Sequence, residues 1–305
     1  MVQPQVKTFF EQTWCGIAWS DWLPFTRAQM ARLPGRPGLY RLRAAGSEDL
    51  FYIGASPTRG LRMYLTGLHQ AAFRDRSQMP YGGMDAWDYL VAPALWTWRD
   101  AEGCSYECSA APIDATRQVI EGLMCALLWE YRRVQGESPR VNYGRFHPHY
   151  RASATFLTNR GRQRLRGARL PEGHTNLAAD ESHAPLPPMA IERISDTYWM
   201  GLHWGEWIDL RAPDTPRGTS LPRGPAIYAV ANGQTWDELL FVGFKWDLHA
   251  AYASIARRPW DCPLPALRAY TVGAQDLPEH QWRELVGDLV GGYFSIKREP
   301  PRLQF

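Results

Sequence analysis

Residues 38–54 read Gly-Leu-Tyr-Arg-Leu-Arg-Ala-Ala-Gly-Ser-Glu-Asp-Leu-Phe-Tyr-Ile-Gly. Two apolar runs with strand composition, Gly38–Leu42 and Leu50–Ile53, flank a polar turn, and this pattern predicts a β-hairpin. Because side chains alternate between the two faces of a strand, Tyr40 and Tyr52 can share one face of the hairpin. The stretch therefore predicts two strands that present a pair of phenol rings.

A helix is expected directly after this hairpin. Gly54 ends the second strand, and Ser56-Pro57-Thr58 has the composition of a helix start. Arg62 follows ten residues after Tyr52. Two phenols and a guanidinium that converge at a hairpin–helix junction suit a phosphate better than a carbonyl group. The junction is therefore a candidate phosphate-binding site.

The length and composition are those of a globular protein with room for two domains. The chain has 305 residues, of which 45% are hydrophobic and 21% charged, and this excludes a disordered chain. No apolar run is long enough to cross a bilayer, and the N-terminus lacks the order of a signal peptide. The five cysteines are odd in number and scattered, so reduced thiols and a cytoplasmic location are expected. The net charge of +3 permits nucleic-acid binding but does not argue for it.

The chain contains an internal duplication. Three tryptophans and a glycine in Trp14–Trp22 recur at identical spacing in Trp199–Trp207. Further segments match in the same order: Leu50–Gly54 with Leu239–Gly243, and Pro139–Asn142 with Pro301–Gln304. We therefore expect a first domain over residues 1–145, a connector over 146–195 and a second domain over 196–305.

The expected fold class is α+β, with two small domains that each have a mostly antiparallel three-stranded sheet flanked by helices. Apolar periodicity predicts helices over 59–73 and 114–134 in the first domain and over 281–294 in the second. The third strand of the first domain is expected at 87–91.

These motifs resemble the GIY-YIG nuclease family. Gly38-Leu39-Tyr40 and Tyr52-Ile53-Gly54 correspond to its two tripeptides, and Arg62 to its phosphate-clamping arginine. The resemblance covers about residues 38–142 and implies hydrolysis of DNA phosphodiester bonds. It implies that Tyr40 acts as base on a water and that Tyr52 hydrogen-bonds the phosphate or that water. Ala55 departs from the family, in which a lysine often follows the glycine, and this argues against the excision-repair branch.

The resemblance also implies a metal-holding glutamate and a terminal asparagine. Glu121 and Glu130 lie nine residues apart on one expected helix, on opposite sides, so both cannot face one site. We choose Glu121, because Glu284 of the second copy lies at nearly the same distance from the matching proline; Glu130 is the alternative. The glutamate would hold one Mg²⁺ or Mn²⁺ ion, mostly coordinated by water. Asn142 would position the scissile phosphate.

Each candidate also has a purely structural interpretation. The tyrosines can be strand aromatics, and Arg62 and Glu121 can be solvated surface residues. Asn142 can be a turn or cap residue. The joint spacing of the tyrosines, their glycines and the arginine favours the functional interpretation.

The connector begins with a basic stretch. Residues 143–171 contain no acidic residue and carry arginines that could follow a duplex backbone without reading its sequence; a solvated loop is the alternative. These arginines are Arg145, Arg151, Arg160, Arg162, Arg164, Arg166 and Arg169. Arg59, one helical turn before Arg62, is added as a DNA contact. Residues 172–189 are rich in Pro, Ala and His and are expected to be a tether.

The second copy departs from the motif at the site. It keeps Tyr228 but has Phe241, Ala251 and Gln304 where the first copy has the second tyrosine, the arginine and the asparagine. We expect this copy to be inactive and retained for DNA contact, substrate choice or packing.

Together these features predict a divalent-metal-dependent DNA endonuclease with one active site per chain, acting on double-stranded DNA and not at a membrane. A prokaryotic restriction or defence role is expected. The alternatives are a repair or mobile-element nicking nuclease, a nuclease directed at modified DNA, and a non-catalytic nucleic-acid binding protein. One site cuts one strand, so duplex cleavage would need a homodimer or sequential nicking.

Overall fold

The chain folds into two compact units. The structure, a computed structural model, describes residues 8–73, 91–157, 163–188, 198–211, 221–270 and 277–305. The first unit comprises Met1–Ile120 and Val134–His183, and the second comprises Glu121–Arg133 and Ala184–Phe305. This division differs from the expected domains at two places. Most of the expected connector belongs to the first unit, and a segment from the middle of a long helix belongs to the second.

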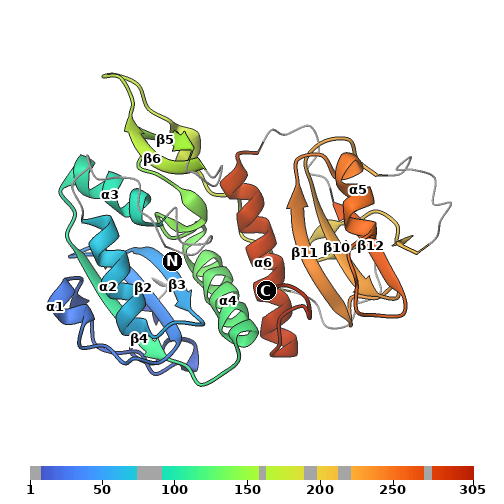
Figure 1. Cartoon of the computed structure of the whole chain (residues 1–305), viewed down its shortest axis with the longest axis horizontal. Coiled ribbons are helices and arrows are strands. Elements are labelled where there is room, and N and C mark those ends of the chain that lie inside the picture. Colours follow the sequence, from blue (N-terminus) through green and yellow to red (C-terminus); the bar gives the residue numbers. More distant parts are fainter. Residues whose placement is uncertain (1–7, 74–90, 158–162, 189–197, 212–220, 271–276) are drawn as a thin grey trace, which may run out of the picture. The chain divides into compact units, whose positions relative to one another are not determined.

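The first unit is built on a four-stranded antiparallel sheet (Figure 1). The expected hairpin is present, with Tyr40 directly opposite Gly54 in the register. A two-residue edge strand adds a fourth member to the three that were expected, and the α+β class is confirmed. In spatial order the strands are β1 (Leu23–Pro24), β4 (Tyr106–Pro112), β2 (Gly38–Ala44) and β3 (Leu50–Ser56).

The two helices expected in this unit are present, and two further helices, at Arg27–Met30 and Val91–Glu102, were not expected. Residues 87–90 lie outside the described residues, and Val91 begins a helix, so the prediction of a strand ending at Val91 was wrong; the third strand is β4. The α-helices are α1 (Arg27–Met30), α2 (Leu61–Ala72), α3 (Val91–Glu102) and α4 (Arg117–Gln135). Short 3₁₀ turns occur at Thr8–Phe10, Trp14–Gly16, Asn142–Gly144 and Leu177–Ala179.

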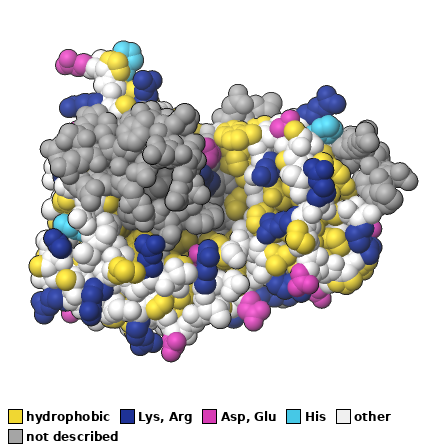
Figure 2. Space-filling model, viewed as in Figure 1, with side chains coloured by type: hydrophobic (Ala, Val, Ile, Leu, Met, Phe, Trp, Pro, Cys, Tyr) yellow, Lys and Arg dark blue, Asp and Glu magenta, His cyan; other side chains and the backbone are white. Residues whose placement is uncertain are grey.

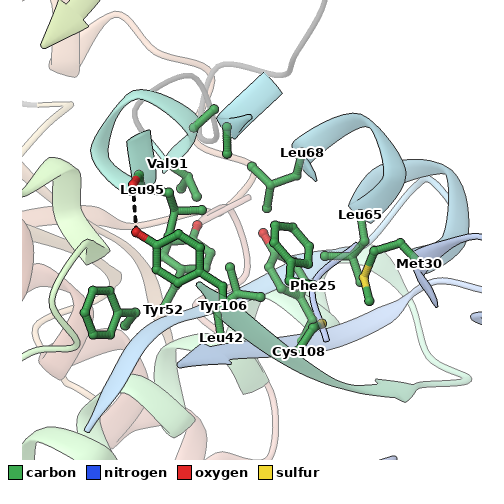
Figure 3. Packing of buried hydrophobic residues seen from close by; sticks show 14 of the residues in the cluster. Phe25, Met30, Leu42, Tyr52, Leu65, Leu68, Val91, Leu95, Tyr106 and Cys108 are labelled. Carbon is green, nitrogen blue, oxygen red and sulfur yellow. Dashed lines mark hydrogen bonds between the residues drawn. The ribbon is translucent and has the colours of Figure 1, made fainter. Parts of the chain in front are cut away.

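Helices α2 and α3 cover one face of the first sheet and enclose its apolar core (Figures 1 and 3). Tyr52, Tyr106 and Leu95 belong to this core, and the Tyr106 hydroxyl donates a hydrogen bond to the Leu95 carbonyl at 2.7 Å. Burial of these rings removes a large apolar area from water. The face that carries the tyrosines is therefore a packed face of the sheet.

The basic stretch forms a β-hairpin. Strands β5 (Tyr150–Leu157) and β6 (Gln163–Arg169) pair antiparallel, with Tyr150 opposite Arg169. Tyr150 is fully buried and packs with Trp96 and Phe146, which ties the base of the hairpin to the first unit. The basic part of the expected connector is therefore a folded element of the first unit.

The second unit repeats the sheet of the first. Its strands lie in the order β9 (Ile208–Asp209), β12 (Pro265–Tyr270), β10 (Ala226–Asn232) and β11 (Leu239–Lys245), the same order as β1, β4, β2 and β3. A small pair, β7 (Tyr198–Trp199) and β8 (Leu202–His203), precedes the sheet, and the helices are α5 (Leu248–Ala256) and α6 (Glu279–Lys297).

Both faces of this second sheet are covered, α5 on one side and α6 on the other (Figure 1). Along β10, Ile227 and Ala229 belong to the core shared with α6, whereas Tyr228 and Val230 belong to the core shared with α5. This alternation is the period of two of a strand, here with apolar residues on both faces because both faces are buried.

Candidate functional site

The structure brings Tyr40 and Tyr52 together, as the alternation predicted. Their ring centroids are 5.7 Å apart with planes inclined by 33°. A third phenol joins them: the Tyr64 ring, from α2, lies 5.5 Å from that of Tyr40, and the two hydroxyl oxygens are 3.4 Å apart. All three side chains are buried, Tyr40 at 0%, Tyr52 at 6% and Tyr64 at 7% exposed. The cluster is therefore part of the core, and only two of its members reach the surface at all.

Gly54 is explained by these rings. A Cβ at this position would lie 2.3 Å from Cε1 of Tyr52 and 2.6 Å from Cζ of Tyr40. Gly54 is opposite Tyr40 in the register, so the two rings cross the strand where the glycine leaves space. The Tyr-Ile-Gly tripeptide thus has a packing requirement of its own, independent of any chemistry.

Arg62 lies in the first turn of α2 with an exposed side chain. Its Nε donates to the Leu33 carbonyl at 2.9 Å, and its backbone N–H donates to the Pro34 carbonyl at 3.1 Å. Among the described residues, its terminal nitrogens have no protein partner, and their N–H groups can donate to both oxygens of a bidentate anion. The neighbouring Arg59 is also exposed. The structure thus leaves both arginines accessible, as a phosphate contact requires.

Asn142 holds the backbone of β3. Its Oδ1 accepts from the Ile53 N–H at 3.0 Å, and its Nδ2 donates to the Ile53 carbonyl at 2.9 Å. The side chain is buried at 4% exposed. In the second unit Gln304 makes the same two bonds to Val242, at 2.8 and 3.0 Å. The contacts of Asn142 are therefore those of a backbone clamp, and any contact with a phosphate would depend on its second Nδ2 hydrogen.

The metal-ligand candidates are less well placed. Glu121 begins the α4 segment that belongs to the second unit, whereas both tyrosines, Arg62 and Asn142 belong to the first. Its side chain is only 8% exposed. Glu130 is paired with Arg133 at 3.0 Å.

A hydrated divalent ion does not fit this donor set. Mg²⁺ keeps several waters and needs open space beside its carboxylate, which the buried Glu121 does not offer. The surroundings of Glu121 are poor in solvent: burial, with the nearby Glu121 charge, raises the pKa of Cys125 to about 12. Within the described residues, no group of three or more His, Cys, Asp or Glu side chains is arranged to hold a metal.

The expected DNA-contacting arginines have different outcomes. Arg145 is 1% exposed, donates to the Ser138 carbonyl at 3.0 Å and pairs with Asp180 at 3.2 Å. Its guanidinium is committed inside the first unit, so the structure does not support it as a DNA contact. Arg151 and Arg169 are exposed on the hairpin.

The remaining arginines of the hairpin are described less fully. Arg164 and Arg166 lie in β6, where the structure describes the backbone alone, and Arg160 and Arg162 lie outside the described residues. By register, positions 151, 164 and 166 share one face of the β5–β6 ribbon.

Tyr64 is the residue that the motif analysis missed. It stands two positions after Arg62 in the sequence, and no tripeptide marks it. The available signal was helical: a helix that packs on the tyrosine face must direct a row of its side chains at that face, and Tyr64 belongs to that row.

Comparisons of the chain with protein-family models, curated proteins and solved structures found no match. All five cysteines are free thiols, as expected from their number and spacing. In the part of the chain that the structure describes, no helix combines the length and apolar character needed to cross a bilayer.

Proposed function

We propose that this chain is an endodeoxyribonuclease of the GIY-YIG type, with one active site in the first unit. The observation that carries the proposal is the approach of two strand tyrosines to each other beneath a helix whose first turn carries an exposed arginine.

In the proposed reaction a water attacks phosphorus, a new P–O bond forms, the opposite P–O bond to the leaving strand breaks, and the proton that the water releases is balanced by protonation of the leaving oxygen. Arg62 stabilises the additional charge on the phosphate with its terminal N–H groups. Tyr52 and Tyr64 orient the water. Tyr40 is fully buried, so it acts through the Tyr64 hydroxyl, 3.4 Å away, and not by direct contact with substrate.

The restriction or defence role enters the proposal through the family resemblance. A dependence on Mg²⁺ or Mn²⁺ enters through that resemblance alone, because neither the buried Glu121 nor the paired Glu130 offers an open ligand, and the EDTA arm of the experiment below tests it. Five free thiols suit a reducing cytoplasm. A repair or mobile-element nicking nuclease would use the same site.

A second candidate function is DNA binding without catalysis. The packing of Tyr40, Tyr52 and Gly54 recurs in the second unit with Tyr228 and Phe241 across Gly243, at the same 5.7 Å between centroids and a similar angle of 34°. The second unit keeps this ring packing although Phe241 lacks a hydroxyl, and this favours a binding role over a catalytic one. In this case both copies would be recognition surfaces.

Cleavage of supercoiled plasmid distinguishes the candidates. Wild type is incubated with Mg²⁺ or with EDTA, beside Arg62→Ala and the control Arg32→Ala, which removes another exposed arginine of the first unit. We expect cleavage by wild type and Arg32→Ala with Mg²⁺ only, and at least about a hundredfold loss in Arg62→Ala, the scale of losing one transition-state donor. Absence of cleavage on modified and unmodified plasmid, with retained gel-shift binding, would replace the nuclease by the binding protein.

A further inference from the structure

The second unit keeps the ring pair of the first but supplies its arginine from elsewhere. The position ten residues after Phe241 is Ala251. Arg258, which follows the end of α5, instead places its guanidinium carbon 4.7 Å from the ring centroid of Phe241 and 4.7 Å from that of Trp260. The sequence alignment of the two copies could not find this arginine, because it is not at the equivalent position.

This guanidinium is held in a defined orientation. It stacks against two rings, and its Nη2 donates to the Leu303 carbonyl at 3.1 Å. These two cation–π contacts and the hydrogen bond position the group, and its other N–H groups can donate to an anion. The side chain is exposed, and within the described residues no carboxylate pairs with it.

The surroundings of Arg258 also suit an anion. Its charge acts on the buried Tyr228 phenol: burial raises the pKa of Tyr228 to about 12, and the nearby guanidinium opposes that rise. Arg257 beside it is exposed as well. Figure 2 shows Lys and Arg side chains, with some Asp and Glu, interspersed with hydrophobic ones on the visible face of the second unit.

Hydrolysis is not expected here. Phe241 has no hydroxyl to orient a water. Glu284, the counterpart of the metal-ligand candidate, is fully buried and paired with Arg132 at 3.2 Å. The site therefore has a cation and an aromatic ring pair, and of the two strand phenols of the first copy it keeps only the buried Tyr228.

We propose that Arg258, stacked on Phe241 and Trp260, binds a backbone phosphate of duplex DNA, so that the second copy is a non-catalytic DNA-binding site. The inference rests on the proposed function for its choice of DNA as ligand. It assigns the degenerate copy a role in affinity and not in sequence reading, since a phosphate contact carries no base information.

The test is binding of the full-length protein to a fluorescent 20-bp duplex, followed by anisotropy in EDTA at several salt concentrations. We expect Arg258→Ala to weaken binding about tenfold, equally on unrelated sequences, and to lower the slope of log K against log salt by about one. Arg257→Ala removes the same charge without the stacked geometry and should weaken binding less. Arg258→Lys should be intermediate, because it keeps charge but not the planar fork.

Several outcomes separate this inference from the proposed nuclease. Loss of affinity in Arg258→Ala, with wild-type thermal unfolding and no plasmid cleavage by any variant, supports the binding site and refutes the nuclease. Plasmid cleavage by wild type, with unchanged binding by Arg258→Ala, refutes the binding site alone. Equal losses in Arg257→Ala and Arg258→Ala would also overturn it, because general charge would then suffice.

Discussion

At the scale of single residues, the same glycine and ring pair occur in both units, and packing alone accounts for them. The Cβ that an alanine would add at Gly54 meets both tyrosine rings, and the one at Gly243 would lie 2.5 Å from Phe241. The glycine and the ring pair therefore do not distinguish the first unit from the second. The distinguishing features are the hydroxyl of Tyr52, the third phenol from α2, and the exposed Arg62.

Gly54→Ala is expected to lower the free energy of unfolding by about 1–3 kcal/mol, because the methyl group must displace buried rings or the strand. Gly67→Ala is a matched control in the same unit. It lies inside α2 with no atom within 4 Å of its Cβ position, so it should be stabilising by up to about 1 kcal/mol. Urea unfolding followed by circular dichroism measures both. Equal stability of Gly54→Ala and wild type would show that the rings are loosely packed.

The sequence predicted which side chains share a face but not how deeply they are buried. Alternation along two strands suffices to place Tyr40 beside Tyr52. Burial depends on α2 and α3, which pack over that face, and α3 was not predicted at all. For the same reason Arg145 was assigned to DNA: its partner Asp180 is distant in the sequence, and composition alone made it part of a basic stretch.

At the scale of elements, the tryptophan segments show how two copies can keep a structure with different residues. In the first unit Arg41, from β2, lies beneath the rings of Trp19 and Trp22, at 4.5 and 4.9 Å from their centroids. In the second unit the arginine comes from the neighbouring strand β12, where Arg268 lies 4.9 Å from the Trp207 ring. The two arginines lie at equivalent places in the two sheets but on different strands. Arg41 of β2 pairs with Ser109 of β4, whereas Arg268 of β12 pairs with Ala229 of β10.

The burial of Arg41 is compensated by its partners. Burial lowers its pKa to about 9, which leaves it protonated at neutral pH. Its Nη2 donates to the Glu11 carbonyl at 2.8 Å, and its Nη1 donates to the Phe9 carbonyl. The tryptophan segment therefore folds over a charged strand residue, which supports a packing role for these rings in both copies.

The clamp on β3 gives a prediction at this scale. Asn142→Ala removes two hydrogen bonds and leaves the buried Ile53 N–H and carbonyl without these partners, so we expect a loss of about 2 kcal/mol in unfolding free energy. Gln304→Ala should cost a similar amount in the second unit. If Asn142 serves only as a clamp, plasmid cleavage well below the melting temperature should be reduced less than about threefold. A loss of cleavage as large as that of Arg62→Ala, in a folded protein, would instead assign it to the phosphate.

At the scale of the whole molecule, the duplication predicted that both halves would have the same sheet, and the strand orders agree. The boundary could not be predicted, because residues 121–133 belong by packing to the second unit and not by their place in the sequence. Gly291 on α6 shows the reason: a Cβ there would lie 2.4 Å from the Cys125 carbonyl oxygen, so the two helices pack with almost no side chain between them. Such contact between residues far apart in the chain leaves no periodic signal.

A buried charge cluster joins the same two helices within the second unit. Arg132 pairs with Asp288 at 2.8 Å and with Glu284 at 3.2 Å, and all three side chains are fully buried. The Leu186 N–H donates to the second Asp288 oxygen at 2.9 Å. Two carboxylates share one guanidinium, so the cluster carries an excess negative charge in a medium that solvates it poorly.

This excess predicts how stability depends on pH. Burial, only partly opposed by Arg132, raises the pKa of Asp288 to about 6 from 3.8. Between these values the folded state holds a proton that the unfolded state has lost, so the contribution of Asp288 is greatest below about pH 4 and is lost as pH rises through about 6.

Asp288→Asn cannot titrate, so the unfolding free energy of wild type relative to this variant should fall over that range, by at most about 1.4 kcal/mol per pH unit. Glu284→Gln removes a nearby carboxylate that helps to raise the pKa of Asp288. The unfolding free energy of this variant should therefore decline at lower pH than that of wild type. Urea unfolding at intervals from pH 4 to 7.5 measures all three proteins, and parallel curves for wild type and Asp288→Asn would mean that this cluster does not hold the proton.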